Sequence, residues 1–185
     1  ILLLTFTNKA AAEMIARLKK FFDKDKIDKI EAGTFHAVSY KWLKKLNPGI
    51  ALKQPRELKT LFSAIHDRYV QTVKFYDNRP YSANFLYDVY ESYLASCEDR
   101  LFDYLEKNAP TQLEHEDLYI KIFEAFDEQK KECGFVGFND LLVQASAAQI
   151  EGRLKGYFEV LVDEYQDTNN LQHHLVESVK PKSLF

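Results

Sequence analysis

Residues 1–11 read ILLLTFTNKAA, and this stretch decides the fold class. Residues 1–6 form a short apolar run, which predicts a buried strand. The apolar spacing that follows predicts a helix over residues 8–22, with Thr7 or Asn8 as its cap. A buried strand that leads directly into a helix is typical of an α/β unit.

The same order of elements recurs in the next part of the chain. A charged stretch, residues 23–29, is expected to be a loop. It leads to an expected strand at residues 30–34 and a helix over residues 36–46, which the turn residues NPG at 47–49 end. Alternation of strand and helix predicts a parallel sheet with crossover connections.

The pattern changes between residues 55 and 131, where glycine is absent and helical periods dominate. Breaks at residues 78–80 and 108–110 separate the expected helices, so this region is predicted to be an all-helical inserted subdomain. Its aromatic residues could form a stacking platform for bases, but their helical spacing favours a hydrophobic core. These residues are Phe85, Tyr87, Tyr90, Tyr93, Phe102 and Tyr104.

The α/β pattern resumes after residue 137, with a helix expected over residues 138–150 and a strand over 157–162. The last residues of that strand are apolar on both faces, as in a covered parallel sheet. Another strand is expected to begin at residue 183. The predicted fold class is therefore α/β, with an incomplete parallel sheet made by the two ends of the chain and a helical insertion between them.

Composition excludes several classes of protein. With 185 residues and 46% hydrophobic side chains, the chain can bury a core, which argues against general disorder. No apolar run approaches the roughly eighteen residues of a membrane span, so we expect a soluble chain with no membrane partner. Cys97 and Cys133 are far apart and outside any CxxC pair, which predicts two free thiols in a reducing compartment.

The net charge of −3 conceals an uneven distribution along the chain. Residues 1–60 carry 13 Lys+Arg against 6 Asp+Glu, a balance of +7, and the remainder carries −10. The basic third could hold a phosphate-binding face, although lysines on solvated helix faces would produce the same count.

Two carboxylates, Asp163 and Glu164, follow the strand at residues 157–162 directly. In open parallel sheets, ligands bind at the carboxyl ends of the strands. One such carboxylate can hold Mg²⁺, usually through water, while its neighbour orients or deprotonates an attacking water. An acidic pair in so acidic a sequence can also be solvated surface, but the apolar strand before it favours a site.

Two strand-to-helix turns carry further candidate residues. Backbone N–H groups at a helix start can cradle a phosphate, although capping alone would explain the polar residues there. Phe6 and Phe35 could each offer a ring to an unstacked base, or could be buried beneath the sheet. The adjacent His173 and His174 point in different directions on a helix, so they are expected to be surface residues without a shared metal.

These segments together resemble the superfamily 1 helicases of the UvrD/Rep/PcrA kind. Residues 5–14, TFTNKAAAEM, look like motif Ia of that family, and TFH at 34–36 looks like its next motif. GFNDLL at 137–142 is similar to the DFDDLL segment, with Gly and Asn where the family usually has Asp. DEYQDT at 163–168 is similar to motif II, the Walker B element, and NLQ at 170–172 continues the likeness.

The resemblance implies that residues 1–53 and 132–185 form most of a RecA-like domain, called 1A, and that residues 54–131 form the inserted 1B subdomain. It implies a cytoplasmic, ATP- and Mg²⁺-dependent DNA helicase of repair or replication. Such a motor moves 3′ to 5′ along single-stranded DNA and acts on junction DNA. A RecB/AddA-type helicase–nuclease, or a catalytically inactive homologue that binds DNA or protein, remain alternatives.

The resemblance also implies roles for individual residues. Asp163 would be the metal-associated acid and Glu164 the base that activates water, while Gln166 and Asp167 would couple the nucleotide state to the DNA side. The residues implied to lie along the DNA track are Thr5, Phe6, Thr7, Asn8, Lys9, Thr34, Phe35 and His36.

A GxxxxGK[ST] phosphate loop is absent from these 185 residues. The family places this loop upstream of motif Ia, which here means before Ile1, and a second RecA-like domain with an arginine finger would follow Phe185. Both ends are therefore expected to be cuts through a larger fold. Without the lysine of the phosphate loop and the arginine finger, these 185 residues alone are not expected to hydrolyse ATP.

Overall fold

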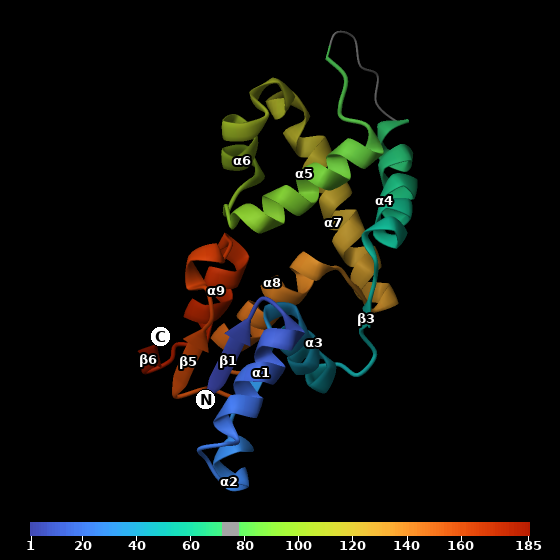
Figure 1. Ribbon diagram of the computed structural model, residues 1–185. Coiled ribbons are helices and arrows are strands. Elements are labelled where there is room, and N and C mark those ends of the chain that lie inside the picture. Colours follow the sequence, from blue (N-terminus) through green and yellow to red (C-terminus); the bar gives the residue numbers. More distant parts are fainter. Residues whose placement is uncertain (72–77) are drawn as a thin grey trace. The chain divides into compact units, whose positions relative to one another are not determined.

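The computed structural model describes residues 1–71 and 78–185, which form two compact units (Figure 1). One unit consists of residues 1–48 and 141–185, and the other of residues 49–140. The first is an α/β unit and the second is mainly helical. The sequence predicted domain boundaries after residues 53 and 131, and these boundaries stay a prediction.

The α/β unit is built on a four-stranded parallel sheet with the strand order β2-β1-β5-β6. Its strands are β1 (Leu2–Thr5), β2 (Glu31–Thr34), β5 (Glu159–Val162) and β6 (Ser183–Leu184). Strand β1 pairs with β5, so the two ends of the chain meet in the middle of the sheet. The predicted α/β class with a parallel sheet is confirmed.

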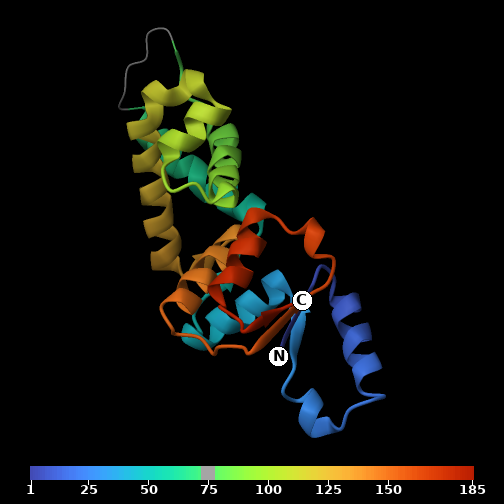
Figure 2. The same ribbon diagram turned by 90° about the vertical axis from the view of Figure 1, so that its left-hand side faces the viewer.

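Helices cover both faces of this sheet. Figure 2 shows α1 on one face and α3 and α8 on the other. The helices of the sheet region are α1 (Asn8–Leu18), α2 (Lys24–Ile27), α3 (Phe35–Leu46), α8 (Phe138–Ile150) and α9 (Asn170–Ser178), with a 3₁₀ turn η2 (Tyr165–Asp167) before α9. Leu2, Leu4 and Val160 have no exposed surface, because central strands covered on both faces bury most of their side chains.

Two local predictions in this unit were wrong. Helix α1 ends at Leu18, four residues before the predicted end, and the last two apolar residues of the predicted helix, Phe21 and Phe22, are exposed. Helical spacing alone did not place them in a core. The stretch predicted as a charged loop contains the short helix α2, which buries Ile27.

The helical unit contains α4 (Pro55–Val70), α5 (Ala83–Ser96), α6 (Leu101–Asn108) and α7 (Glu116–Cys133), with a 3₁₀ helix η1 (Pro110–His115). Strands β3 (Ala51–Leu52) and β4 (Phe135–Val136) pair in parallel, and the sequence did not predict them. Residues 72–77 of the predicted insertion lie outside the described residues. No helix in the described ranges is long and apolar enough to cross a membrane.

The aromatic residues of the insertion divide between core and surface. Phe62 is completely buried, and its ring packs against those of Tyr87, Tyr90 and Phe126 at centroid distances of 5.6, 6.2 and 5.1 Å. The predicted core role is confirmed for Tyr87 and Tyr90. It is wrong for Phe85 and Phe102, which are 53% and 37% exposed. Both cysteines are free, as predicted.

Candidate functional site

Three of the predicted segments end at the same edge of the sheet. Thr34 at the end of β2 lies opposite Thr5 at the end of β1, and Leu4 lies opposite Val162 at the end of β5. The backbone N–H of Asp163 donates to the carbonyl of Leu4 over 2.9 Å, which holds the first acid beside β1. Parallel pairing therefore brings segments that lie far apart in the sequence to one edge.

The acidic pair lies at the carboxyl end of β5. Asp163 is half-buried and Glu164 is exposed. Glu164 has φ 54° and ψ 47°, a left-handed backbone conformation that is unfavourable for a residue with a Cβ. Such conformations persist only where the surroundings hold them, and they occur often at functional sites. The side-chain amide of Gln166 donates to the Glu164 carboxylate, and Asp167 is exposed.

The carboxylates at the end of β5 can hold Mg²⁺ only together with further ligands. Within residues 1–71 and 78–185 there is no group of three or more His, Cys, Asp or Glu side chains that could hold a metal. Mg²⁺ is commonly bound through one or two carboxylates together with water and the phosphates of a nucleotide. The Asp163 carboxylate fits that type of coordination and would contribute one protein ligand.

The turn after β1 is shaped by its own hydroxyl groups. Thr5 is fully buried and donates to the Thr7 carbonyl over 2.8 Å, and the Thr7 hydroxyl accepts from the Ala10 N–H over 3.0 Å as the cap of α1. Capping thus accounts for Thr7. Asn8 and Lys9 are exposed in the first turn of the helix, and the Lys9 ammonium lies 3.9 Å from Glu13.

The turn after β2 repeats this arrangement. Thr34 accepts from the Ala37 N–H over 3.2 Å and caps α3. Phe35 is 1% exposed and its ring packs against that of Phe6, which is 38% exposed, at a centroid distance of 5.7 Å. A ring so deeply buried has no face for a base, so Phe35 supports Phe6. Burial lowers the pKa of His36, which favours its neutral form.

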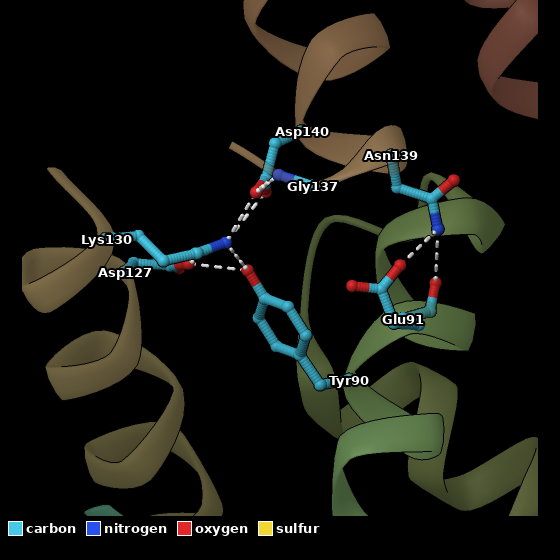
Figure 3. Close-up of polar contacts among 7 residues, drawn as sticks. All are labelled: Tyr90, Glu91, Asp127, Lys130, Gly137, Asn139 and Asp140. Carbon is cyan, nitrogen blue, oxygen red and sulfur yellow. Dashed lines mark hydrogen bonds and ion pairs between the residues drawn. The ribbon is translucent and has the colours of Figure 1, made fainter. Parts of the chain in front are cut away.

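The segment that resembles DFDDLL lies in a buried polar network of the helical unit (Figure 3). Asp140 accepts from the Gly137 N–H over 2.7 Å, and its two oxygens lie 2.8 and 2.9 Å from the Lys130 ammonium. Lys130 also donates to the Tyr90 hydroxyl over 2.7 Å and lies 3.0 Å from Asp127. These contacts hold residues 137–140 against α5 and α7 within the helical unit, which is a structural role.

Sequence reasoning missed the side chains that connect the turn after the acidic pair to α9. Tyr165 forms a hydrogen bond through its hydroxyl with Nδ1 of His173 on α9, and Nε2 of His173 lies 3.3 Å from Glu177. His173 was predicted to be a surface residue, and it is exposed, but it is not without partners. The four-residue spacing from His173 to Glu177 was the available signal.

A parallel sheet with acids at the carboxyl end of a covered strand, interrupted in sequence by a helical insertion, is consistent with a fragment of a RecA-like domain. The family described as UvrD/REP helicase N-terminal domain matches residues 1–184. The chain therefore belongs to the UvrD/REP helicase family, and the resemblance found in the sequence is confirmed.

Individual relatives agree with this membership. The chain is 27% identical to ATP-dependent DNA helicase PcrA of Leuconostoc citreum, over 99% of the chain and 25% of that protein. It is 27% identical to ATP-dependent DNA helicase Rep of Buchnera aphidicola, over 97% of the chain and 28% of that protein. A third relative is an ATP-dependent helicase/nuclease of Clostridium botulinum, 32% identical over 50% of the chain and 9% of that protein. The chain thus spans about a quarter of the length of the first two relatives.

Proposed function

We propose that the protein to which this chain belongs is an ATP-dependent DNA helicase that moves along single-stranded DNA, with 3′ to 5′ polarity, in repair or replication. One observation carries the proposal: an acidic pair follows β5 at the same sheet edge as the two strand-to-helix turns of β1 and β2. Membership of the helicase family supports it.

In this proposal the acidic pair does the hydrolytic chemistry. Asp163 would hold the Mg²⁺ ion that accompanies ATP, and this ion would neutralise charge on the phosphates. Glu164 accepts a proton from the attacking water at its exposed carboxylate. The amide of Gln166 donates to that carboxylate and orients it. Asp167, exposed on the same turn, links this site to the DNA side.

The two helix starts at the sheet edge form the DNA side of the proposed site. The partly exposed Phe6 ring stacks against a base, and the buried Phe35 ring supports it from below. Asn8 and Lys9 face the backbone phosphates from the first turn of α1, where free N–H groups and the helix dipole favour anions. Thr5, Thr7 and Thr34 shape the two turns through their hydrogen bonds, and the neutral His36 lies beside them.

The assignment of Glu164 is tested by Glu164→Gln in the full-length protein. Loss of the general base should lower kcat for ATP hydrolysis by about 10²- to 10⁴-fold, with nucleotide affinity retained. Asp25→Asn, an exposed acid on α2, serves as the matched control and should leave turnover unchanged. Undiminished turnover in Glu164→Gln would refute the assigned role.

The DNA side is tested by Phe6→Ala, measured by fluorescence anisotropy with a labelled single-stranded oligonucleotide. Stacking on an aromatic ring contributes about 1–3 kcal/mol per base, so DNA affinity should fall accordingly while ATP affinity holds. Phe21→Ala removes a ring that is 79% exposed and lies away from the edge turns, and it should change neither affinity. Equal losses of DNA and ATP affinity in Phe6→Ala would contradict the proposed track.

A second candidate is the motor part of a helicase–nuclease, which the similarity to the Clostridium botulinum helicase/nuclease favours. The coding sequence around this segment separates the candidates. A nuclease domain after a second motor domain identifies the helicase–nuclease. A degenerate phosphate loop upstream would instead identify an inactive binding homologue.

A further inference from the structure

The backbone conformation of the turn that carries Glu164 must be held by contacts with its surroundings. Its left-handed backbone conformation is unfavourable for a residue with a side chain, so local contacts must hold it. Within the turn, the Asp167 N–H donates to the Glu164 carbonyl over 2.9 Å and the Thr168 N–H donates to the Tyr165 carbonyl over 3.1 Å. These bonds close a single 3₁₀ turn, which by itself is a weak element.

A chain of three side chains connects this turn to α9. The Tyr165 hydroxyl bonds to Nδ1 of His173, and the two rings meet edge to face at a centroid distance of 5.9 Å. On the far side of the imidazole, Glu177 lies 3.3 Å from Nε2. A carboxylate beside Nε2 favours a proton on that nitrogen, so Nδ1 is left to accept from the tyrosine. With the ring in that tautomer, the Tyr165 hydroxyl donates to His173, and Glu177 lies beside the protonated nitrogen.

Helix α9, which carries His173 and Glu177, is rigidly held. Asn169 and Gln172 form a reciprocal capping box at its start, with hydrogen bonds of 2.9 and 3.0 Å. Leu175 and Val176 on its inner face have no exposed surface. His173 lies between these two fixed regions on the outer face, so its ring is held from a rigid helix.

We propose that Tyr165, His173 and Glu177 are positioning residues that hold the Glu164 turn in its left-handed conformation and thereby aim the carboxylate. This inference rests on the proposed function of Glu164 as the base. None of the three touches the reacting atoms, since each acts through the backbone of the turn. Removal of the tyrosine hydroxyl should loosen the turn and misplace the base, which lowers turnover more than nucleotide binding.

The first experiment tests whether Tyr165 stabilises the Glu164 turn, and it does not depend on ATP hydrolysis. Amide hydrogen exchange is measured on the full-length protein by mass spectrometry with residue-level fragmentation, comparing the wild type, Tyr165→Phe and the control His174→Gln. Loss of one hydrogen bond should speed exchange at the Asp167 and Thr168 amides by about tenfold. The Asp163 amide, bonded to Leu4 within the sheet, should not change and reports on any global loosening. Unchanged exchange at Asp167 and Thr168 would overturn the proposal.

The second experiment measures ATP hydrolysis by the full-length protein. Tyr165→Phe should lower kcat by about tenfold with KM for ATP unchanged, whereas His174→Gln should match the wild type. His173→Gln keeps an acceptor and a donor on one amide and should retain more activity than His173→Ala. Faster exchange combined with unchanged kcat would overturn the role in hydrolysis. If the wild type does not hydrolyse ATP but exchange is faster in Tyr165→Phe, the proposed function is refuted. The conclusion that Tyr165 stabilises the turn still holds.

Discussion

The buried pair of Lys130 and Asp140 should show strong energetic coupling. Their side chains are 5% and 10% exposed, and the ammonium lies 2.8 Å from one carboxylate oxygen. Asp140→Asn keeps an acceptor for the Gly137 N–H but leaves the lysine charge buried. Removal of one partner of a buried pair costs about 3–5 kcal/mol. We expect about 3 kcal/mol, the lower end of that range, because Asp127 still lies 3.0 Å from the ammonium.

The double variant Lys130→Met/Asp140→Asn separates this coupling from the loss of packing. Lys130→Met alone leaves the Asp140 charge buried and should also cost about 3 kcal/mol. The double variant removes both charges, so it should be no less stable than either single variant, which corresponds to a coupling free energy of about 3 kcal/mol. The methionine keeps contact with the Phe126 ring, over which the ammonium lies at 4.7 Å.

Urea unfolding followed by circular dichroism measures these free energies, because the pair lies in the helical unit. The single Trp42 lies in the α/β unit and would not report on this change. Lys131→Met alters the next, exposed lysine and should shift stability by less than about 0.5 kcal/mol. A loss below about 1 kcal/mol in Asp140→Asn, as for a surface pair, would refute the reasoning, and so would additive losses in the double variant.

Two further predictions concern the same unit. Burial and the nearby Asp140 raise the pKa of Glu91, so its contribution to stability is present at low pH and is lost as pH rises through the folded-state pKa. Glu91→Gln keeps an acceptor for Asn139 and should flatten that decline when urea unfolding is measured between about pH 4 and 8; an unchanged pH dependence would contradict it. Phe62→Ala should lower stability by about 3–5 kcal/mol in the same assay, and a loss below about 1 kcal/mol would show that its aromatic cluster is not a tight core.

Local sequence patterns predicted the strands of the sheet well. The apolar run at residues 1–6 predicted a buried strand, and residues Leu2–Thr5 form one with every side chain buried. Helix α8 begins at Phe138 and ends at Ile150, the predicted range. The pattern failed at the end of α1, where Phe21 and Phe22 have helical spacing but are exposed. Periodicity records which side chains could share a face, and packing decides whether a core meets that face.

Some of the site residues could be identified from the sequence, and others only from the structure. The order of chemical groups along the chain was enough to single out Asp163 and Glu164 after a covered strand. The burial of Phe35 could not be read from its position, since Phe6 has the same relation to its own strand and remains partly exposed. The link from Tyr165 to His173 joins a turn and a helix whose separation depends on how α9 packs.

By itself, the sequence determined the α/β class, the helical insertion and the family, because periodicity, turn residues and motif order are properties of neighbouring positions. Only the tertiary structure decided which strands are adjacent, which rings keep a free face, and which buried charges meet. Those outcomes depend on distances between residues far apart in the chain, such as Lys130 and Tyr90, and such distances are established only when the whole core packs.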